Sequence, residues 1–353
     1  MKQGVKTITV RPGRLSRGGR VSVTIKDVAR EANVSVATVS RALNGHDNVA
    51  EEVRQRVLGV ADRLRYSPHH AARSLSSRRT HTIGVVLPDL YGEFFSELMR
   101  GIDQVARERG LHLLVSSYHG NPQEQGAALR AMRGRVDGLL VMSPFVGNRE
   151  LLEQSLSPAL PALLINSADA GGHPALNVDS YGGARVMVEH LLEAGHRRIA
   201  FIAGPDDNFD ARERLRGYCD ALAAKLPRKE PWVLPGDFDE ASGHRAGQAL
   251  IAADVRPDAV FAANDMMALG CLFAFSQAGM RVPDDIALAG FDDIPLARYV
   301  HPTLTTMRVD IAELGGRALR KLLDGAADAA EAPPELSPQL VVRESSGTVQ
   351  AGG

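Results

Sequence analysis

The sequence of 353 residues contains only two cysteines and has no long apolar segment. Cys219 and Cys271 are far apart in the chain, and Cys271 lies inside an apolar stretch, so we expect neither a disulfide framework nor a zinc cluster. No apolar run approaches the roughly 18 to 20 residues that a membrane-spanning helix needs. The few cysteines favour a reducing compartment. We therefore expect a cytoplasmic protein of two or three compact domains without membrane contact.

Acidic residues are absent from the first twenty positions, and so is the apolar segment of a secretory signal, so nothing in this stretch predicts export. The stretch carries six Lys or Arg residues, and three Gly residues stand in its last eight positions. We predict that residues 1–22 form a disordered basic arm. An extension without a role is the favoured interpretation, and an arm that contacts phosphates is the alternative.

The motifs of common enzyme classes are also missing. The sequence has no Gly-x-Ser-x-Gly nucleophile elbow, no Gly-x-x-x-x-Gly-Lys phosphate loop and no His-Glu-x-x-His zinc motif. The neighbouring residues His69 and His70 cannot face one ion from a helix, and His190 and His196 lie off a shared helical face. We therefore predict a protein that is not an enzyme and that has no cofactor and no metal site.

The net charge of −1 hides a division of the chain into a basic front end and an acidic remainder. Residues 1–80 carry 16 Lys or Arg and 6 Asp or Glu, a net charge of +10, whereas residues 81–353 carry 25 and 36, a net charge of −11. Concentrated positive charge supplies the sequence-independent part of the affinity for nucleic acid. The front end is thus a candidate nucleic-acid interface, although a solvated basic surface has the same composition.

Residues 24–65 show the apolar spacing of three short helices. Thr24 can cap a first helix whose inward face consists of Ile25, Val28, Ala29 and Ala32. Asn33 suits a tight turn with left-handed backbone, and Ser35 can cap a second helix over 36–43. A third helix is predicted over 51–65, where two acidic residues stand at the positive end of the helix.

The second helix would expose a polar and basic face near its N-terminus. The side chains left outside the core, and available to a DNA major groove, are Val36, Ala37, Ser40 and Arg41. A generic helical bundle is the alternative. Two short helices at this spacing, within a segment of net charge +10, favour DNA binding.

The segment over 23–44 reads VTIKDVAREANVSVATVSRALN and closely resembles the headpiece of the lactose-repressor (LacI/GalR) family of bacterial transcription regulators. The resemblance continues to about residue 346. It implies a helix-turn-helix DNA-binding domain over 23–68, a hinge helix and linker over 69–81, an effector-binding and dimerisation core over 82–346, and a tail over 347–353. Asn33 stands where the family usually has Gly, and Ala50 stands where a Ser or Thr often caps the third helix.

The resemblance also implies which residues contact DNA. It assigns base edges to Val36, Ala37 and Arg41, of which Arg41 can make a bidentate contact with guanine. The side chains that it assigns to phosphates are Thr24, Ser35, Thr38, Ser40 and Asn44. In the hinge, the resemblance implies contacts that form when two subunits meet over the operator. Ala71 and Ala72 allow close approach, and Leu75 inserts between base pairs from the minor groove. A plain linker is the alternative for this segment.

The remainder of the chain alternates short apolar runs with amphipathic helices, the pattern of parallel sheets with helices on both faces. One such helix is expected over 95–109, and the expected strands are 83–87, 111–116, 138–142, 162–165, 199–203, 259–262 and 286–289. Ligands of such sheets bind beyond the carboxyl ends of the strands. The polar residues at these points are Asp89, Ser116, Ser143, Asn166, Asp179, Asn264, Asp265, Asp292 and Asp293.

Four segments of this remainder, over 83–88, 135–138, 195–200 and 264–270, resemble the same family. The resemblance implies a two-lobed, periplasmic-binding-protein-like α/β core, doubly wound with parallel sheets and crossovers, and an effector in the cleft. The implied effector contacts are an apolar wall of Phe94 and Phe95, a stacking face of Phe238, and polar groups of Ser143, Asn166, Arg214, Asn264 and Asp292. Structural alternatives exist: Arg214 can pair with an acid on its own helix, Phe95 can belong to the core, and Asp265 can cap the helix that follows.

These features predict a homodimeric repressor whose affinity for double-stranded operator DNA is controlled by a small molecule. A carboxylate, a guanidinium and an amide beside an aromatic face suit the vicinal hydroxyls of a sugar. A purine-like corepressor is the alternative effector, and a solute-binding module without DNA function is the alternative protein class. The last residues lack the leucine heptad of tetrameric family members, which favours a dimer.

Overall fold

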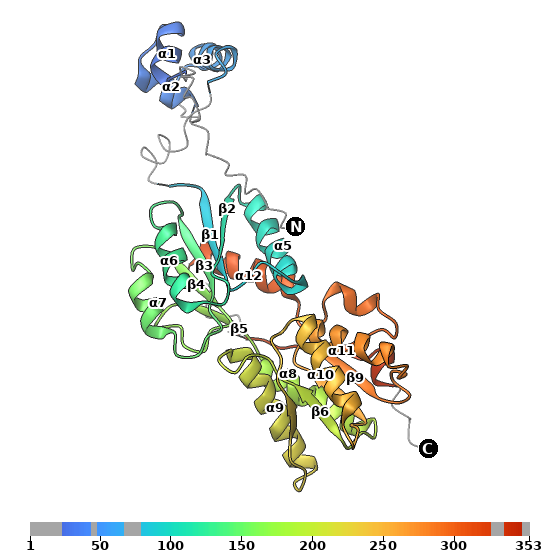
Figure 1. The fold of residues 1–353 in the computed structure, drawn as a ribbon. Helices are drawn as coiled ribbons and strands as arrows, with labels where there is room; N and C mark the ends of the chain where they lie inside the picture. The colour runs from blue at the N-terminus through green and yellow to red at the C-terminus, as the bar shows by residue number, and fades with distance from the viewer. Residues whose placement is uncertain (1–22, 44–47, 67–78, 326–334, 348–353) are drawn as a thin grey trace, which may run out of the picture. The chain divides into compact units, whose positions relative to one another are not determined.

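The computed structural model describes residues 23–43, 48–66, 79–325 and 335–347 (Figure 1). The chain forms two compact units, residues 1–78 and 79–353. The predicted basic arm, most of the predicted hinge and most of the tail lie outside the described residues, and so do Asn44, Ala71, Ala72 and Leu75. Among the described residues, no helix is both long enough and apolar enough to cross a membrane.

The first unit, which we call the headpiece, contains three helices around one apolar core. They are α1 (Ile25–Glu31), α2 (Val36–Leu43) and α3 (Glu51–Arg63). Val28, Val39 and Val57, one from each helix, are fully buried. The bounds of α2 confirm the prediction, and Asn33 in the preceding turn has the expected left-handed backbone, with φ 51°. The third helix ends before the predicted Arg65, because Arg65 itself takes a left-handed backbone, with φ 50°.

The second unit, which we call the core, has two lobes, each built on a six-stranded sheet. The sheet of the first lobe, the N-lobe, has the order β11-β5-β4-β3-β1-β2 and is parallel throughout. Its strands are β1 (Thr82–Leu87), β2 (His112–Ser117), β3 (Gly138–Met142), β4 (Ala162–Ile165), β5 (Ala175–Val178) and β11 (Glu335–Leu336). Its helices are α5 (Glu93–Glu108), α6 (Pro122–Met132), α7 (Arg149–Ser155) and α12 (Ile311–Asp324).

The N-lobe sheet is buried on both faces. Val85 of β1 belongs to the apolar cluster that contains Leu98 of α5 and Leu314 of α12, whereas Val86 belongs to a second cluster with Leu129 of α6. Because successive side chains of a strand point to opposite faces, α5 and α12 cover one face and α6 the other. This two-sided burial explains why the strands read as continuous apolar runs in the sequence.

The second lobe, the C-lobe, has the strand order β12-β10-β9-β8-β6-β7, in which only β12 is antiparallel to its neighbour. Its strands are β6 (Ile199–Ile202), β7 (Trp232–Leu234), β8 (Ala259–Ala262), β9 (Ala287–Asp292), β10 (Thr305–Arg308) and β12 (Gln339–Val341). Its α-helices are α8 (Ser180–Glu193), α9 (Phe209–Lys225), α10 (Glu240–Ala252) and α11 (Asp265–Gln277), and two 3₁₀ helices are η1 (Pro295–Arg298) and η3 (Glu344–Ser346).

The chain passes between the lobes three times, at 178–180, 308–311 and 336–339. A helix-turn-helix headpiece with a two-lobed α/β core confirms the predicted fold class. The seven predicted strands are present, although the last extends to Asp292 and not to Ala289. The predicted helix over 95–109 is α5, which begins at Glu93. The sequence did not predict the short strands β5, β7, β10, β11 and β12, which have three or four residues or, for β11, two.

Candidate functional site

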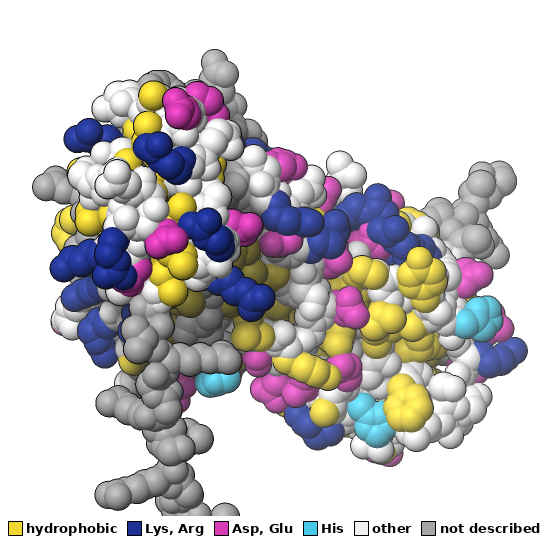
Figure 2. All heavy atoms as spheres, turned by 90° about the horizontal axis from the view of Figure 1, so that it is seen from above, with side chains coloured by type: hydrophobic (Ala, Val, Ile, Leu, Met, Phe, Trp, Pro, Cys, Tyr) yellow, Lys and Arg dark blue, Asp and Glu magenta, His cyan; other side chains and the backbone are white. Residues whose placement is uncertain are grey.

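The headpiece presents the N-terminal half of α2 to solvent. Val36 is 41% exposed, Ala37 and Arg41 are exposed, and Ser40 is partly buried, whereas Val39 and Ala42 are in the core. The predicted division of α2 into an outer and an inner face is therefore present in the structure. Lys and Arg side chains, with Asp and Glu side chains between them, are spread over the visible surface of the headpiece (Figure 2, dark blue and magenta), and positive charge there favours contact with a polyanion.

Of the hydroxyl residues predicted to contact phosphates, Thr24, Ser35 and Thr38 lie at the beginnings of α1 and α2, and Ser40 lies farther along α2. Ser35 caps α2, because its Oγ accepts a hydrogen bond from the amide of Thr38 at 3.1 Å and lies 2.8 Å from Thr38 Oγ1. Thr24 donates through its backbone amide and its hydroxyl to the carboxylate of Asp27, at 2.9 and 2.7 Å. These local bonds fix the hydroxyls at helix N-termini, the positive ends that attract phosphate.

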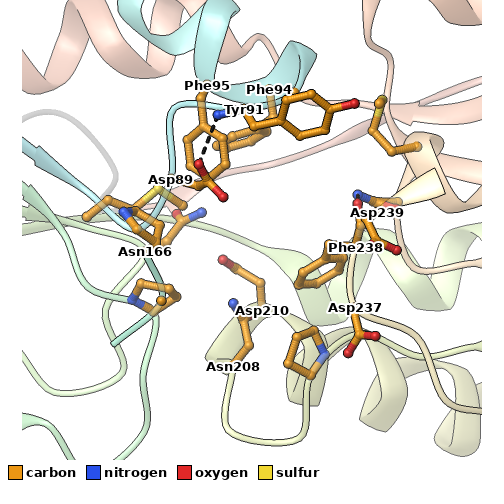
Figure 3. A pocket seen from close by; sticks show the side chains of 18 of the residues that line it. Asp89, Tyr91, Phe94, Phe95, Asn166, Asn208, Asp210, Asp237, Phe238 and Asp239 are labelled. Carbon is orange, nitrogen blue, oxygen red and sulfur yellow. Dashed lines mark hydrogen bonds between the residues drawn. The ribbon is translucent and has the colours of Figure 1, made fainter. Parts of the chain in front are cut away.

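The core contains a cavity of about 430 Å³ to which both lobes contribute (Figure 3). Its lining includes the residues that follow β1, β4, β6 and β8 and the last residue of β9. These are the carboxyl ends of parallel strands, where the sequence predicted a ligand. Seven of the eight predicted effector contacts line the cavity, namely Phe94, Phe95, Asn166, Arg214, Phe238, Asn264 and Asp292.

Aromatic rings from both lobes border the cavity. Phe94 and Phe95, in the first turn of α5, form an edge-to-face pair with centroids 5.6 Å apart. Both are partly buried and pack against the core, so Phe95 serves as core and as cavity wall. Phe238 belongs to the C-lobe and has φ 65°. Its ring covers Gly204, where a Cβ would lie 2.4 Å from Phe238 Cζ, so only glycine leaves room for this ring position.

Arg214 and Asp292 form a buried ion pair on the C-lobe side of the cavity. Arg214 Nη2 lies 3.3 Å from Asp292 Oδ1, and their side chains are 5% and 6% exposed. Arg214 Nη1 donates to the carbonyl oxygen of Ala263 at 2.6 Å, and its Nε donates to Ser180 Oγ at 3.3 Å. The guanidinium also stacks on the ring of Phe291, 3.8 Å from the centroid. Arg214 is therefore rigidly oriented before any ligand binds.

Asp210 adds a second buried carboxylate beside Arg214, one helical turn earlier on α9. Burial raises the pKa of Asp210, although the charge of Arg214 and hydrogen bonds from Ser180 and Asn166 oppose this rise. Burial likewise raises the pKa of Asp292 to about 7, against the opposing charge of Arg214. The ion pair of Arg214 is therefore with Asp292 at the end of β9, while Asp210, on the same helix as Arg214, lies close enough for the two charges to interact.

Two buried oxygen atoms in the cavity accept no hydrogen bond from any described residue: Asp292 Oδ1 and Asn166 Oδ1. The contact of Asp292 Oδ1 with Arg214 at 3.3 Å is an ion pair without hydrogen-bond geometry. Asp292 is 4% exposed and Asn166 is 1% exposed. A buried acceptor without a donor costs free energy, so these atoms are prepared for a ligand that donates.

Of three further predicted residues, two have structural tasks and one lies away from the cavity. Asn264 caps α11 by accepting from the amide of Met267 at 3.0 Å, and its Nδ2 donates to the carbonyl oxygen of Phe238 at 2.9 Å. Ser143 is completely buried and does not line the cavity. The expectation that Asp265 caps α11 was wrong, because Asn264 caps it. Asp265 instead accepts from the hydroxyl of Thr306 at 2.6 Å and from the amide of Ile294 at 3.0 Å.

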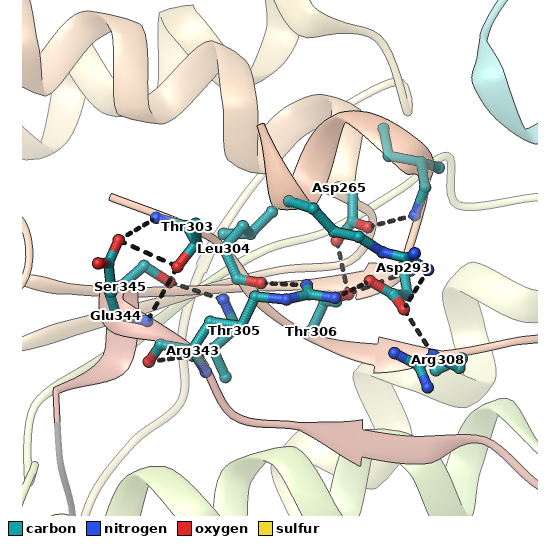
Figure 4. Close-up of polar contacts among 12 residues, drawn as sticks. Asp265, Asp293, Thr303, Leu304, Thr305, Thr306, Arg308, Arg343, Glu344 and Ser345 are labelled. Atoms are coloured by element: carbon teal, nitrogen blue, oxygen red, sulfur yellow. Dashed lines mark hydrogen bonds and ion pairs between the residues drawn. The ribbon is translucent and has the colours of Figure 1, made fainter. Parts of the chain in front are cut away.

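Asp293, the neighbour of Asp292, anchors the end of β9 (Figure 4). Its buried carboxylate contacts Arg308 Nε at 2.6 Å, Arg298 at 3.5 Å and Arg343. Asp292 and Asp293 both have positive φ, 112° and 55°, a backbone that non-glycine residues adopt only at a cost. The three arginines offset this cost and so hold Asp292 at the cavity.

Sequence reasoning missed most of the acidic groups that line the cavity. Eight lining residues are Asp or Glu; the N-lobe contributes Asp89 and Glu93, and the C-lobe contributes Asp207, Asp210, Asp237, Asp239, Glu240 and Asp292. The i, i+4 spacing of Asp210 and Arg214 is a sequence signal for one of them. The others lie in loops or at helix starts, where acidic residues are ordinarily caps. Within the described part of the chain, no group of His, Cys, Asp and Glu residues is arranged to hold a metal ion.

A helix-turn-helix headpiece joined to a two-lobed core with a ligand cavity defines a class of ligand-responsive DNA-binding proteins. Residues 24–69 match the model of bacterial regulatory proteins of the lacI family, and residues 188–346 match the periplasmic binding protein-like domain. The chain is 36% identical to Catabolite control protein A of Priestia megaterium over 306 residues, which is 86% of this chain and 92% of the relative.

Solved structures show the same similarity over more than nine tenths of the chain. The crystal structure of the Lac repressor dimer bound to operator and the anti-inducer ONPF has a TM-score of 0.83 and 29% identity, and the match covers 93% of this chain and 100% of that one. The complex of the transcriptional regulator CelR with cellobiose has a TM-score of 0.64 and 32% identity, covering 92% and 99%. The chain belongs to the LacI family of bacterial regulatory proteins, and it is a DNA-binding transcription regulator with an effector-binding core.

Proposed function

We propose that the protein is a repressor that binds double-stranded operator DNA as a homodimer and changes its affinity when a sugar occupies the cavity of the core. The observation that carries this proposal is the pair of buried acceptors without donors, Asn166 Oδ1 in the N-lobe and Asp292 Oδ1 in the C-lobe. A single polyol that donates hydroxyl hydrogens to both would hold the lobes in one arrangement. Only a ligand that prefers one arrangement can shift a conformational equilibrium.

A sugar fits the composition of the cavity. Its hydroxyls can donate to carboxylate and amide oxygens, while the rings of Phe94, Phe95 and Phe238 cover its apolar face. The similarity to a regulator solved with cellobiose supports this class of effector. A purine-like corepressor is the second candidate, because the same rings offer flat apolar surfaces to a heterocycle.

On the DNA side, the proposal assigns base edges to Val36, Ala37 and Arg41 and phosphates to Thr24, Ser35, Thr38 and Ser40. The exposure of the outer face of α2 supports this assignment. Asn44 and the hinge residues Ala71, Ala72 and Leu75, all outside the described residues, complete the set. The proposal places the protein in the cytoplasm with its DNA and gives it no catalytic step.

The DNA assignment is tested with Arg41→Ala and a control, Arg56→Ala, which removes an exposed arginine from α3. An operator is first selected from random duplexes with the wild-type protein, and affinities are measured by gel shift. We expect Arg41→Ala to weaken operator binding by about 1 to 3 kcal/mol and to relax the preference at one base pair. Equal losses on operator and random DNA would show that Arg41 touches only phosphate, and no retention of any duplex at low salt would overturn the DNA function.

The effector assignment is tested by thermal shift with a panel of sugars and then of purines, because a ligand that binds only the folded state raises the melting temperature. A compound that raises it is then added to the operator complex. Under the proposal, a sugar stabilises the protein and changes operator retention. Stabilisation by purines alone would replace the sugar with the second candidate.

A further inference from the structure

The cavity has an excess of negative charge that its cationic groups do not balance. Among the described residues that line it, Arg214 is the only Arg or Lys, and its guanidinium is already paired with Asp292. Of the eight lining carboxylates, Asp237 has an ion-pair partner on the surface, Arg245 at 3.2 Å. An entering ligand therefore meets carboxylates on both lobes and no arginine or lysine that is available to it.

Hydrogen bonds of the backbone or the side chain hold three of these acidic residues at the cavity. Asp207 lies in a loop of the C-lobe, and its backbone carbonyl oxygen accepts a hydrogen bond from the amide of Val146 in the N-lobe at 2.9 Å. Asp239 caps α10 by accepting from the amide of Ser242 at 2.7 Å. Across the cavity, the hydroxyl of Tyr91 donates to Glu240 Oε1 at 3.3 Å. The lobes thus meet at contacts that involve acidic residues of the cavity.

Buried acceptors without donors give an independent indication of the ligand. Asn166 Oδ1 accepts no hydrogen bond and Asp292 Oδ1 has only its ion pair with Arg214, so a ligand group that donates would complete the hydrogen bonding of both atoms. Hydroxyl and ammonium groups donate, whereas a phosphate dianion or a carboxylate only accepts. The aromatic walls point the same way, because the face of a ring attracts a cation and repels an anion.

Together, these observations indicate a rule of selection, and this inference rests on the proposed function. We propose that the cavity selects its effector by charge: it takes polyhydroxylated ligands that are uncharged or carry a protonated amine, and it rejects their phosphorylated and carboxylated derivatives. A phosphate in this cavity would approach like charges on both sides and leave the two buried acceptors without donors.

The first test compares derivatives of one scaffold by calorimetry on the full-length protein at low salt. A thermal-shift panel of uncharged and amine-bearing sugars identifies the scaffold, and its phosphate, its carboxylate and its amine derivative are then titrated. We expect the two anionic derivatives to bind at least about tenfold more weakly than the parent, and the amine derivative to bind as tightly or more tightly. The charge-dependent differences should shrink with added NaCl.

The second test changes the negative charge of the cavity while keeping the size of its side chains nearly the same. The double variant Glu93→Gln and Asp207→Asn removes one lining carboxylate from each lobe, and Asp206→Asn removes the exposed neighbour of Asp207 that does not line the cavity. The double variant should bind the phosphate derivative severalfold more tightly relative to the parent sugar. The control variant should keep the wild-type ratio.

Each result decides the inference. It is overturned if an anionic derivative binds as tightly as the parent, if no uncharged or amine-bearing sugar stabilises the protein, or if both variants change the ratio equally. An anionic sugar that binds and alters operator retention overturns the charge rule and leaves the proposed function intact. Conversely, a preserved charge ranking with no response of DNA binding to any ligand leaves the rule intact and overturns the proposed function.

Discussion

The two lobes of the core have the same architecture and different chemistry. In both sheets, the first five strands of the lobe have the same order, so that β1 to β5 correspond to β6 to β10. At the end of the fourth strand, both lobes place a polar residue with positive φ at the cavity: Asn166 with φ 48° and Asp292 with φ 112°. The N-lobe residue is a neutral amide, whereas the C-lobe residue is a carboxylate paired with a buried arginine.

The difference extends to the residue that follows. Ser167 donates its hydroxyl to the carbonyl oxygen of Asp169 at 3.4 Å, whereas Asp293 is contacted by three arginines. At the same point of the sheet, a residue with positive φ is thus a neutral amide in one lobe and, in the other, a carboxylate whose neighbour is held by three arginines. The comparison teaches that the strand order determines where a ligand contacts the sheet. The ion pairs and hydrogen bonds around that point determine whether a neutral or a charged side chain can stand there.

The largest expected difference between the lobes is the loss of stability when Asp293 is replaced. Asp293→Ala leaves Arg343, which is 12% exposed, without its carboxylate, and we expect it to lower the free energy of unfolding by about 3 to 5 kcal/mol. Ser167→Ala, the matched N-lobe variant, should cost about 0.5 to 1.5 kcal/mol, because it removes one neutral hydrogen bond. Urea unfolding followed by circular dichroism measures both. Equal losses would mean that Asp293 contributes no special anchoring.

The pH dependence of stability should distinguish the lobes next. Asp292 has its pKa raised by burial to about 7 from 3.8, so the folded state holds a proton that the unfolded state releases. Between pH 4 and 7 the folded state therefore loses stability as pH rises, by up to about 4 kcal/mol, and above pH 7 this contribution is constant.

This contribution is isolated by subtracting the unfolding free energies of Asp292→Asn from those of the wild type at each pH. Fluorescence of Trp232, the single tryptophan, reports on the C-lobe because it lies on β7. The difference curve should fall from pH 4 to 7 and then level off. A flat difference curve would show that Asp292 titrates at its ordinary pKa in the folded protein.

Effector affinity should also depend more on the C-lobe residue than on the N-lobe residue, by a smaller free-energy difference. At pH 8, above the pKa of about 7 of Asp292, Asp292→Asn removes a charged acceptor and should weaken binding of the sugar by about 1.5 to 3 kcal/mol, whereas Asn166→Ala removes a neutral acceptor and should cost about 1 kcal/mol. Calorimetry of both variants with the same sugar gives the two values. The assignment of the stronger contact to the C-lobe fails if Asn166→Ala causes the larger loss.

The smallest expected effects concern two aspartates, one in each lobe, that occupy corresponding positions. Asp137, just before β3, accepts from the amide of Thr80 at 2.6 Å and from the amide of His81 at 2.7 Å. Asp258, just before β8, likewise accepts from the amides of Arg197 and Arg198, at 3.0 and 2.8 Å. Each carboxylate thus fixes the chain that enters the first strand of its lobe.

We expect Asp137→Asn and Asp258→Asn each to lower the unfolding free energy by about 1 to 2 kcal/mol. Only Asp137→Asn should also weaken operator binding, because Thr80 and His81 directly follow the segment that joins the headpiece to the core. Gel shifts with the selected operator compare the two variants. The same operator affinity for both would show that this anchor has no influence on the headpiece.

Much of the fold could be predicted because its signals are local. The helix over 36–43 has a capping residue, Ser35, and a clear inner face, and its predicted bounds are the observed ones. The strands over 138–142 and 259–262 are short apolar runs buried on both faces, so composition alone marks them. β11 and β12 carry no such signal, because they are edge strands of two and three residues that exist only where the chain crosses between the lobes.

The sequence by itself determined the two short helices of the motif, seven of the strands and the edge of each sheet at which polar residues gather, since these follow from periodicity within a few residues, and its resemblance to a known family indicated the class of protein. Only the tertiary structure decided that Asp210 joins Arg214 and Asp292, that Asp265 supports Thr306 and does not cap α11, and that acidic groups of both lobes surround one cavity. These relations depend on segments distant in sequence, and burial, which sets the pKa of each carboxylate, is a property of the folded chain as a whole.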